Sequence, residues 1–66
     1  MQIYINGQRR EVPDACTMQT LVNLLALGEQ RYAVEVNEEL VPRSQFEHHC
    51  LAPDDQVEIV NAIGGG

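Results

Sequence analysis

The sequence ends in Ile63-Gly64-Gly65-Gly66, and its terminal carboxylate is the group best placed to do chemistry. Glycine has no Cβ and adopts backbone conformations that are closed to other residues, so a glycine tail is narrow and unhindered at its last carbonyl. Such a tail can thread a narrow channel into another protein's active site. A frayed terminus or the remnant of an expression tag is the alternative explanation. Against a remnant, the chain begins at Met1 and enters the glycines directly from a strand-like segment.

Cysteine and histidine are the other residue types that could do chemistry. Cys16 and Cys50 lack the Cys-x-x-Cys spacing of zinc sites and redox motifs, and two thiolates cannot hold an iron–sulfur cluster. We interpret both as free thiols with a packing role. His48-His49-Cys50 are consecutive, so their side chains diverge and we expect no metal there. The sequence also has no phosphate-binding Gly-x-x-x-x-Gly-Lys loop, and we expect neither a bound cofactor nor an enzyme.

Chain length and net charge argue against several further classes of function. The chain has 66 residues, and a chain this short buries only about 60% of the surface that its unfolded form exposes, which leaves little room for an enzyme's pocket. The net charge is −6 and the four basic residues are all arginines, a balance that argues against nucleic-acid binding and favours a partner with a basic surface. No segment approaches the roughly 20 apolar residues of a membrane span, and no signal peptide is visible. We therefore expect a cytoplasmic protein that binds no membrane.

Alternating apolar and polar residues predict the strands of a sheet. The dipeptide Asn6-Gly7, the strongest short-range hairpin signal, separates the first two strands. In the last strand, Val57 and Ile59 share one face, whereas Glu58 and Val60 share the other. The predicted strands cover residues 1–5, 10–12, 33–36, 40–41 and 56–62.

Two helical segments are expected beside the sheet. Thr17 is the predicted N-cap of an amphipathic helix of about ten residues that ends at Gly28, with Met18 and Leu27 extending its apolar side. Ser44-Gln-Phe-Glu47 fits a capping box and predicts one helical turn that holds its phenylalanine on the core. The predicted core residues come from the helices and from one face of the strands: Ile3, Ile5, Leu21, Leu24, Leu25, Val34, Val36, Phe46, Val57 and Ile59.

This order of elements resembles the β-grasp fold of ubiquitin-like proteins. The agreement extends to four segments, Val36-Asn37, Leu40-Val41-Pro42-Arg43, Asp55-Gln-Val-Glu-Ile-Val60 and the glycine terminus. In these segments, and in its length, the whole chain resembles the ThiS family of sulfur-carrier proteins of thiamine biosynthesis. The resemblance implies an α+β fold, with one sulfur-carrier domain over residues 1–66. A mixed sheet of four to five strands would pack on one helix, followed by a flexible tail at 63–66. One departure is Pro53-Asp54, where such proteins often have a glycine in the turn.

The resemblance also implies a function for the tail. An enzyme of the ubiquitin-activating type would adenylate the carboxylate of Gly66 with ATP. The adenylate would then become a thiocarboxylate, with sulfur that comes ultimately from cysteine through a donor such as a cysteine desulfurase. Thiazole synthase would receive this sulfur. An α-carboxyl group has a pKa of about 3.3–3.7 and is an unreactive anion at neutral pH, so an external nucleotide must activate it. The protein would be a co-substrate, with ATP bound by its partner.

The sheet face that is turned away from the helix is the predicted docking surface for these partners. Tyr4 and Val60 are expected on it, with Ala62 next to the tail. Isolated exposed apolar side chains are also common on proteins that have no partner there. Arg43 either forms a salt bridge to a partner carboxylate or is a solvated loop residue.

Other functions fit the same tail. The small subunit of molybdopterin synthase shares the fold and the glycine terminus, but it is usually longer and enters a permanent complex. A ubiquitin-like modifier would use the tail in an isopeptide bond, and a plain binding module would not use it at all. Neighbouring genes for thiazole synthase or for molybdenum-cofactor enzymes would discriminate between the two sulfur pathways.

Overall fold

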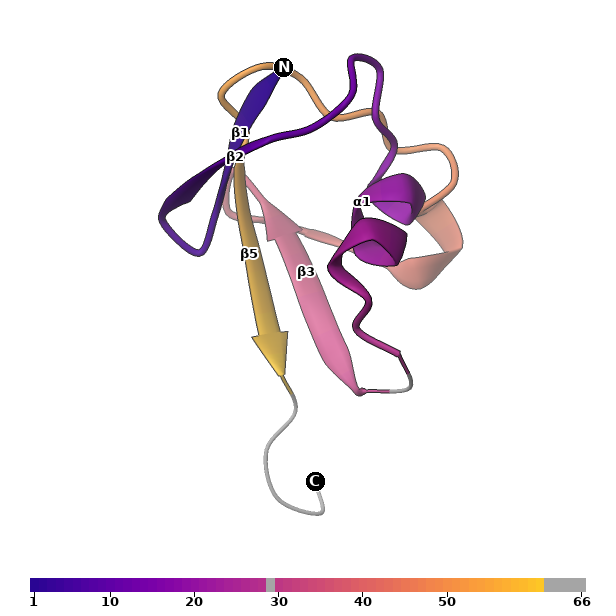
Figure 1. The fold of residues 1–66 in the computed structure, drawn as a ribbon. Coiled ribbons are helices and arrows are strands. Elements are labelled where there is room, and N and C mark those ends of the chain that lie inside the picture. The colour runs from indigo at the N-terminus through magenta and orange to yellow at the C-terminus, as the bar shows by residue number, and fades with distance from the viewer. Residues whose placement is uncertain (29, 62–66) are drawn as a thin grey trace.

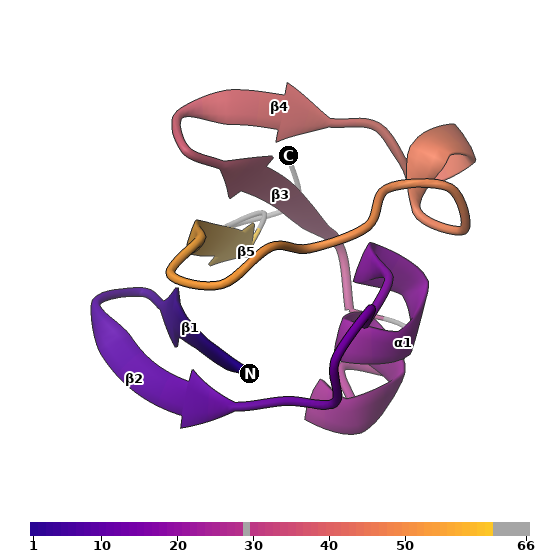
Figure 2. The same ribbon diagram turned by 90° about the horizontal axis from the view of Figure 1, so that it is seen from above.

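A five-stranded sheet and one α-helix form two layers (Figure 1). The computed structural model describes residues 1–28 and 30–61, and the strands lie in the order β2-β1-β5-β3-β4. Viewed from above, the helix lies on one side of the sheet (Figure 2). This confirms the predicted α+β fold. The elements in chain order are β1 (Gln2–Ile5), β2 (Gln8–Glu11), α1 (Met18–Leu25), β3 (Tyr32–Val36), β4 (Glu39–Val41), η1 (Arg43–Gln45) and β5 (Gln56–Asn61).

Two tight turns build the hairpins at the two edges of the sheet. Asn6 and Gly7 have φ values of 50° and 83°, the positive values that a type I′ turn requires, and they join β1 antiparallel to β2. Asn37 and Glu38 have φ values of 51° and 71° and join β3 to β4 in the same way. The predicted Asn-Gly hairpin is therefore confirmed. Its second strand begins earlier than predicted, at Gln8, because a two-residue turn lets pairing start directly after it.

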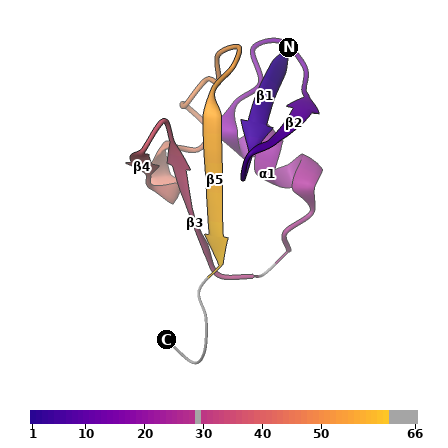
Figure 3. The ribbon, with the colours of Figure 1, turned by 90° about the vertical axis from the view of Figure 1, so that its left-hand side faces the viewer.

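Strand β5 lies at the centre of the sheet and connects the two hairpins (Figure 3). It pairs antiparallel with β3 along nearly all of its length, but it pairs parallel with β1 only at Gln56 and Val57. Val57 and Ile59 pack toward the helix, whereas Glu58 and Val60 are exposed on the opposite side, as predicted. We call this opposite side of the sheet, turned away from α1, the outer face.

The helix begins where predicted and ends early. Thr17 is the N-cap, and its Oγ1 accepts a hydrogen bond from the N–H of Thr20 at 3.1 Å. The helix ends at Leu25 and does not reach Gly28, because Ala26 adopts a left-handed conformation (φ 53°) and donates its N–H to the carbonyl three positions back. In the part of the chain that the structure describes, no helix has the length and apolar character to span a membrane.

The helix buries most of its predicted apolar side, but Leu24 is an exception. Met18, Leu21 and Val22 are buried and Leu25 packs against them, but Leu24 is 50% exposed, so its predicted place in the core is wrong. At 100° per residue, Leu24 lies about 110° away from the middle of the buried stripe. The contact with the sheet follows the stripe that includes Val22, which the sequence analysis did not count.

Most of the predicted core is confirmed. The buried members are Ile3, Leu21, Val34, Val36, Phe46 and Val57, and the partly buried members are Ile5, Leu25 and Ile59. Further buried residues, outside the predicted core, lie in loops or at strand ends: Val12, Cys16, Val41 and Leu51.

The segment between β4 and β5 contains one 3₁₀ turn, Arg43–Gln45. Its N-cap is Pro42 and no side chain caps it, so the predicted capping box at Ser44 is wrong: the turn starts before Ser44, which therefore lies inside it. Phe46 is nevertheless buried, as predicted. In the turn before β5, Asp54 has a φ of 68°. Glycine adopts such left-handed backbone most easily, so a glycine at this position would be less strained than aspartate.

Candidate functional site

Strand β5 is the last described element before the terminal glycines. The predicted tail, Ile63 to Gly66, and the predicted docking residue Ala62 lie outside the described residues. The last described residue of β5, Asn61, pairs with Tyr32 of β3. On the other side, the strand pairing with β1 stops at Val57. Among the described residues, β5 beyond Val57 is hydrogen-bonded to β3 and to the side chain of one residue of the first hairpin.

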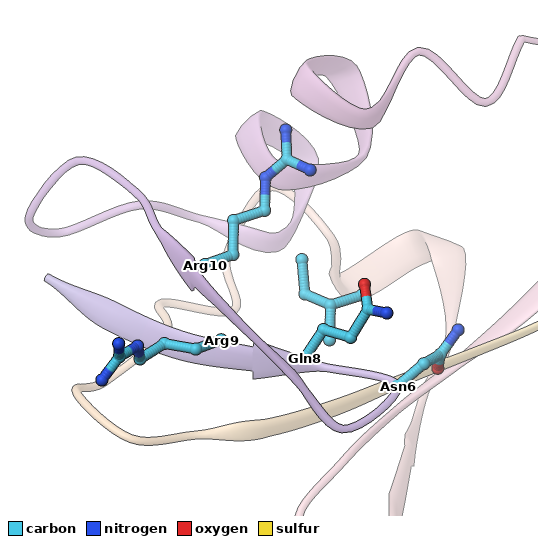
Figure 4. Close-up of a pocket in the computed structure, with 5 residues that line it drawn as sticks. Asn6, Gln8, Arg9 and Arg10 are labelled. Atoms are coloured by element: carbon cyan, nitrogen blue, oxygen red, sulfur yellow. The ribbon is translucent and has the colours of Figure 1, made fainter.

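That side chain belongs to Asn6. The backbone N–H of Asn6 donates to the carbonyl of Val57 at 2.9 Å, which continues the parallel ladder. Its Oδ1 then accepts from the N–H of Ile59 at 2.9 Å, and its Nδ2 donates to the carbonyl of Ile59 at 3.3 Å. The side-chain amide thus takes the place of the next peptide group of β1, while the main chain turns away into the hairpin. Figure 4 shows Asn6 at this bend.

The outer face carries both described docking residues, but the structure does not bring them together. Val60 lies near the end of β5, opposite Ala33, and is 54% exposed. Tyr4 is half-buried opposite Gln56 at the start of β5, and its hydroxyl accepts a hydrogen bond from Gln2 at 3.1 Å. Four residues along a strand correspond to about 13 Å. Tyr4 and Val60 are therefore separate contact points on one face.

Between these two contact points the outer face is acidic. Glu35 and Glu58 occupy directly opposed positions on β3 and β5, where Cβ atoms lie about 4.5–5.5 Å apart and like charges repel. Leu40 lies opposite Glu35 on β4 and is 65% exposed, an apolar surface residue that the sequence analysis missed. Its exposure could have been predicted from the sequence, because Leu40 and the buried Val41 are neighbours on one strand and point to opposite faces.

Arg43 lies away from this acidic pair. Its guanidinium carbon sits 4.6 Å from the centre of the Tyr32 ring, a cation–π contact, and the Tyr32 ring stacks on Phe46 at 6.5 Å. A hollow of about 330 Å³ lies between this stack and the end of α1. Arg43 is thus exposed, but it packs on an aromatic ring and is not merely a solvated loop residue. Its predicted salt bridge to a partner stays a prediction.

A second hollow, of about 370 Å³, lies against the β1–β2 hairpin and is lined by Ile5, Asn6, Gln8, Arg9 and Arg10. Figure 4 shows that Arg10 extends toward α1 and Arg9 away from it, as successive residues of a strand do. The two guanidinium groups therefore do not converge on one anion. The hollow lacks the paired contacts with which arginines hold a phosphate.

Both cysteines are free, as predicted, but their environments differ. Cys16 is buried, and desolvation raises the pKa of its thiol against the opposing charge of the N-terminal amine. Cys50 is exposed, so its predicted packing role is wrong: its neighbour Leu51 takes the buried position. His48 and His49 follow η1. Among the described residues, no three His, Cys, Asp or Glu side chains are grouped to hold a metal ion.

Comparison with known proteins agrees with this geometry. The model of the ThiS family matches residues 3–66. The crystal structure of the thiamine biosynthesis protein ThiS from Geobacter metallireducens has a TM-score of 0.84 and 28% sequence identity, with both chains covered completely. The sulfur carrier protein ThiS of Escherichia coli is 30% identical over the full length of both chains. A thiazole synthase from Paramagnetospirillum magneticum is 36% identical over 66 residues, which is only 20% of that protein's length. The chain belongs to the ThiS family.

Proposed function

We propose that this protein carries sulfur for thiamine biosynthesis on its C-terminal carboxylate. The observation that carries the proposal is its full-length similarity to the sulfur carrier protein of Escherichia coli, together with three terminal glycines that come two residues after the described end of the central strand. The folded domain serves for recognition, and Gly66 supplies the reacting group. The protein is a co-substrate and not an enzyme.

The chemistry proceeds in three steps. An oxygen of the Gly66 carboxylate attacks the α-phosphorus of ATP on an activating enzyme, pyrophosphate leaves, and the carboxylate becomes an acyl adenylate. Sulfur from a persulfide, generated from cysteine by a desulfurase, then attacks the acyl carbon and displaces AMP. Reduction of the resulting disulfide by a thiol leaves the terminal thiocarboxylate. The tethered sulfur is delivered by docking, which gives it a high effective concentration at the acceptor.

Thiazole synthase is the acceptor in this proposal. Two thiazole synthases, from Paramagnetospirillum magneticum and Magnetococcus marinus, match this chain over all 66 residues, which make up 20% of each protein. A segment similar to this carrier thus occurs within the same chain as a thiazole synthase. That arrangement supports a direct transfer of sulfur from the carrier to the synthase.

The outer face is the proposed docking surface for the activating enzyme. Val60 and Leu40 offer exposed apolar contacts, and the opposed Glu35 and Glu58 favour a basic side chain of the partner between them. Val60 lies one position before Asn61, the last described residue of β5. A partner docked over Val60 therefore lies only six residues along the chain from the carboxylate of Gly66.

A mass measurement tests the proposal. Incubated with ATP, the cognate activating enzyme and a persulfide source, the full-length protein should gain the mass difference between sulfur and oxygen. Deletion of Gly66, or an added residue after it, should abolish the gain without unfolding the domain. Gly65→Val should also block it, because a β-branched side chain stiffens and widens the tail. Amide linkage to lysines of other proteins, with no gain of sulfur, would replace the carrier function with that of a modifier.

A further inference from the structure

We propose that the open edge of the sheet at β2 is a docking site for an extended acidic segment of a second partner protein, which adds a strand to the sheet there. This goes beyond the proposed function, because the site lies apart from the outer-face contacts around Val60. In the strand order, β2 is at the edge and β1 separates it from β5. The segment can therefore bind while the activating enzyme covers Val60.

The backbone of β2 has hydrogen-bonding groups that face this edge. The amine of Met1 donates to the carbonyl of Val12 at 2.6 Å, and the N–H of Val12 donates to the carbonyl of Met1 at 2.8 Å. In an antiparallel ladder, a pair that exchanges both bonds alternates with a pair whose backbone groups point away from each other. The register between β1 and β2 therefore turns the N–H and C=O groups of Arg9 and Glu11 outward. An added strand would bond to both residues.

The side chains of β2 make this edge basic on an acidic protein. The net charge is −6 and the chain has only four arginines, yet Arg9 and Arg10 are adjacent on this strand. Glu11 already has a cation nearby, because the N-terminal amine, which also binds Asp14 at 3.0 Å, lies 3.9 Å from its carboxylate. Among residues 1–28 and 30–61, neither Arg9 nor Arg10 forms an ion pair through its side chain. Their charges are therefore available to an acidic partner.

The two arginines flank the edge on opposite faces of the sheet. Arg10 extends toward α1 and Arg9 away from it (Figure 4). Side chains of an added strand also alternate between the faces, so two adjacent carboxylates would meet one guanidinium each. On the α1 side, the hollow of about 370 Å³ beside Ile5 and Gln8 can receive an apolar side chain. The segment that fits has two adjacent acidic residues between β-branched ones.

A second copy of this chain fits the edge less well. Pairing of two β2 strands about a twofold axis sets one residue opposite its own copy. The last three residues of the strand, Arg9, Arg10 and Glu11, are all charged, so an axis at any of them opposes like charges. Charged side chains on an edge strand are also a means of avoiding edge-to-edge self-association. The edge is therefore selective for a segment of opposite charge.

The experiment titrates the full-length protein with the peptide acetyl-Thr-Val-Glu-Glu-Val-Thr-amide and follows the backbone amides by NMR. At saturation, hydrogen exchange of the Arg9 and Glu11 amides should slow about fivefold or more, because both become hydrogen-bonded. The Arg10 amide, which faces Ile3 of β1, should change little. Arg9→Gln and Arg10→Gln should each weaken the affinity about three- to tenfold. Arg31→Gln is the matched control: it removes the same charge from an exposed residue outside β2 and should change the affinity less than about twofold.

Several results would overturn the docking site. They are no binding of the peptide, equal affinity for a peptide with glutamines in place of its glutamates, and equal losses in Arg10→Gln and Arg31→Gln. Loss of binding in Val60→Asp would place the peptide on the outer face. A dimer of the unchanged protein in analytical ultracentrifugation that the peptide dissociates would assign the edge to a second copy. The titration uses neither ATP nor the activating enzyme, so its outcome is independent of the proposed sulfur transfer.

Discussion

Leu21 and Leu24 are residues of the same type on one helix, and they differ in what they face. Leu21 is 0% exposed and Leu24 is 50% exposed. Leu21→Ala removes a buried isobutyl group and leaves a cavity between α1 and the sheet, which costs about 2–5 kcal/mol. Leu24→Ala gives up only about half of the 1.5–3 kcal/mol of a complete burial and regains a little from alanine's higher helix propensity. We expect Leu24→Ala to cost about 1 kcal/mol or less.

These values are large compared with the stability of so small a domain. At roughly 0.05–0.15 kcal/mol per residue, a domain of this length has a free energy of unfolding of about 3–10 kcal/mol. With a urea m-value of about 1 kcal/mol/M, Leu24→Ala shifts the unfolding midpoint by about 1 M or less, and Leu21→Ala by about 2 M or more. If Leu21→Ala unfolds without urea, Ile3→Val is the milder probe. It removes one carbon from a fully buried side chain and costs about 0.5–1.5 kcal/mol.

Urea titration followed by far-ultraviolet circular dichroism measures these shifts. The wild type and both leucine variants are compared at equal protein concentration, and equal m-values confirm that the same amount of surface unfolds in each. A shift for Leu24→Ala as large as that for Leu21→Ala would mean that the helix is rotated about its axis. The core described above would then be wrong.

Three further outcomes are expected. Val60→Asp should weaken binding of the activating enzyme about tenfold or more in calorimetric titration while the thermal midpoint stays the same, and normal affinity would place docking elsewhere. Glu58→Gln should stabilise the free domain by about 0.2–1 kcal/mol in thermal unfolding, because repulsion from Glu35 is lost. In stopped-flow measurements at low salt, the same variant should associate more slowly with the activating enzyme. Faster association would contradict a basic surface on that partner. Maleimide should label Cys50 and spare Cys16 in the folded protein. Stability should fall as the pH rises past the ordinary thiol pKa of about 8.5, because the unfolded chain releases the proton first, and Cys16→Ala should reduce that fall.

The strands were predictable because their signals are local. Asn6-Gly7 specifies a tight hairpin within two residues, and the alternation around Val57 assigns each side chain of β5 to a face. Helix register was not predictable in the same way, because two apolar sets satisfy helical spacing, one with Leu24 and one with Val22. Only packing against a sheet decides between them, and that contact joins segments that are distant in sequence.

The residues of the candidate site also differ in whether local sequence or long-range contacts determine their role. The chemistry proposed for Gly66 follows from the glycine terminus and the resemblance to the ThiS family, and it stays a prediction. The hydrogen bonds of the Asn6 side chain to Ile59 could not be predicted, since an Asn-Gly turn already explains the residue and its partner is 53 positions away. The opposition of Glu35 and Glu58 likewise needs the register between β3 and β5, which no local pattern supplies.

The central position of β5 has a consequence for how the molecule assembles. Each hairpin forms from neighbouring residues, but only β5 unites them into one sheet, through contacts such as those between Asn6 and Ile59, 53 positions apart. Closing so long a loop costs the chain conformational entropy before these contacts form, so we expect the insertion of β5 to be the slowest step of folding. A product of interrupted synthesis that ends before Gln56 would hold two hairpins and a helix without a common sheet. Without that sheet it would lack the outer face proposed for docking, and we expect it to be degraded.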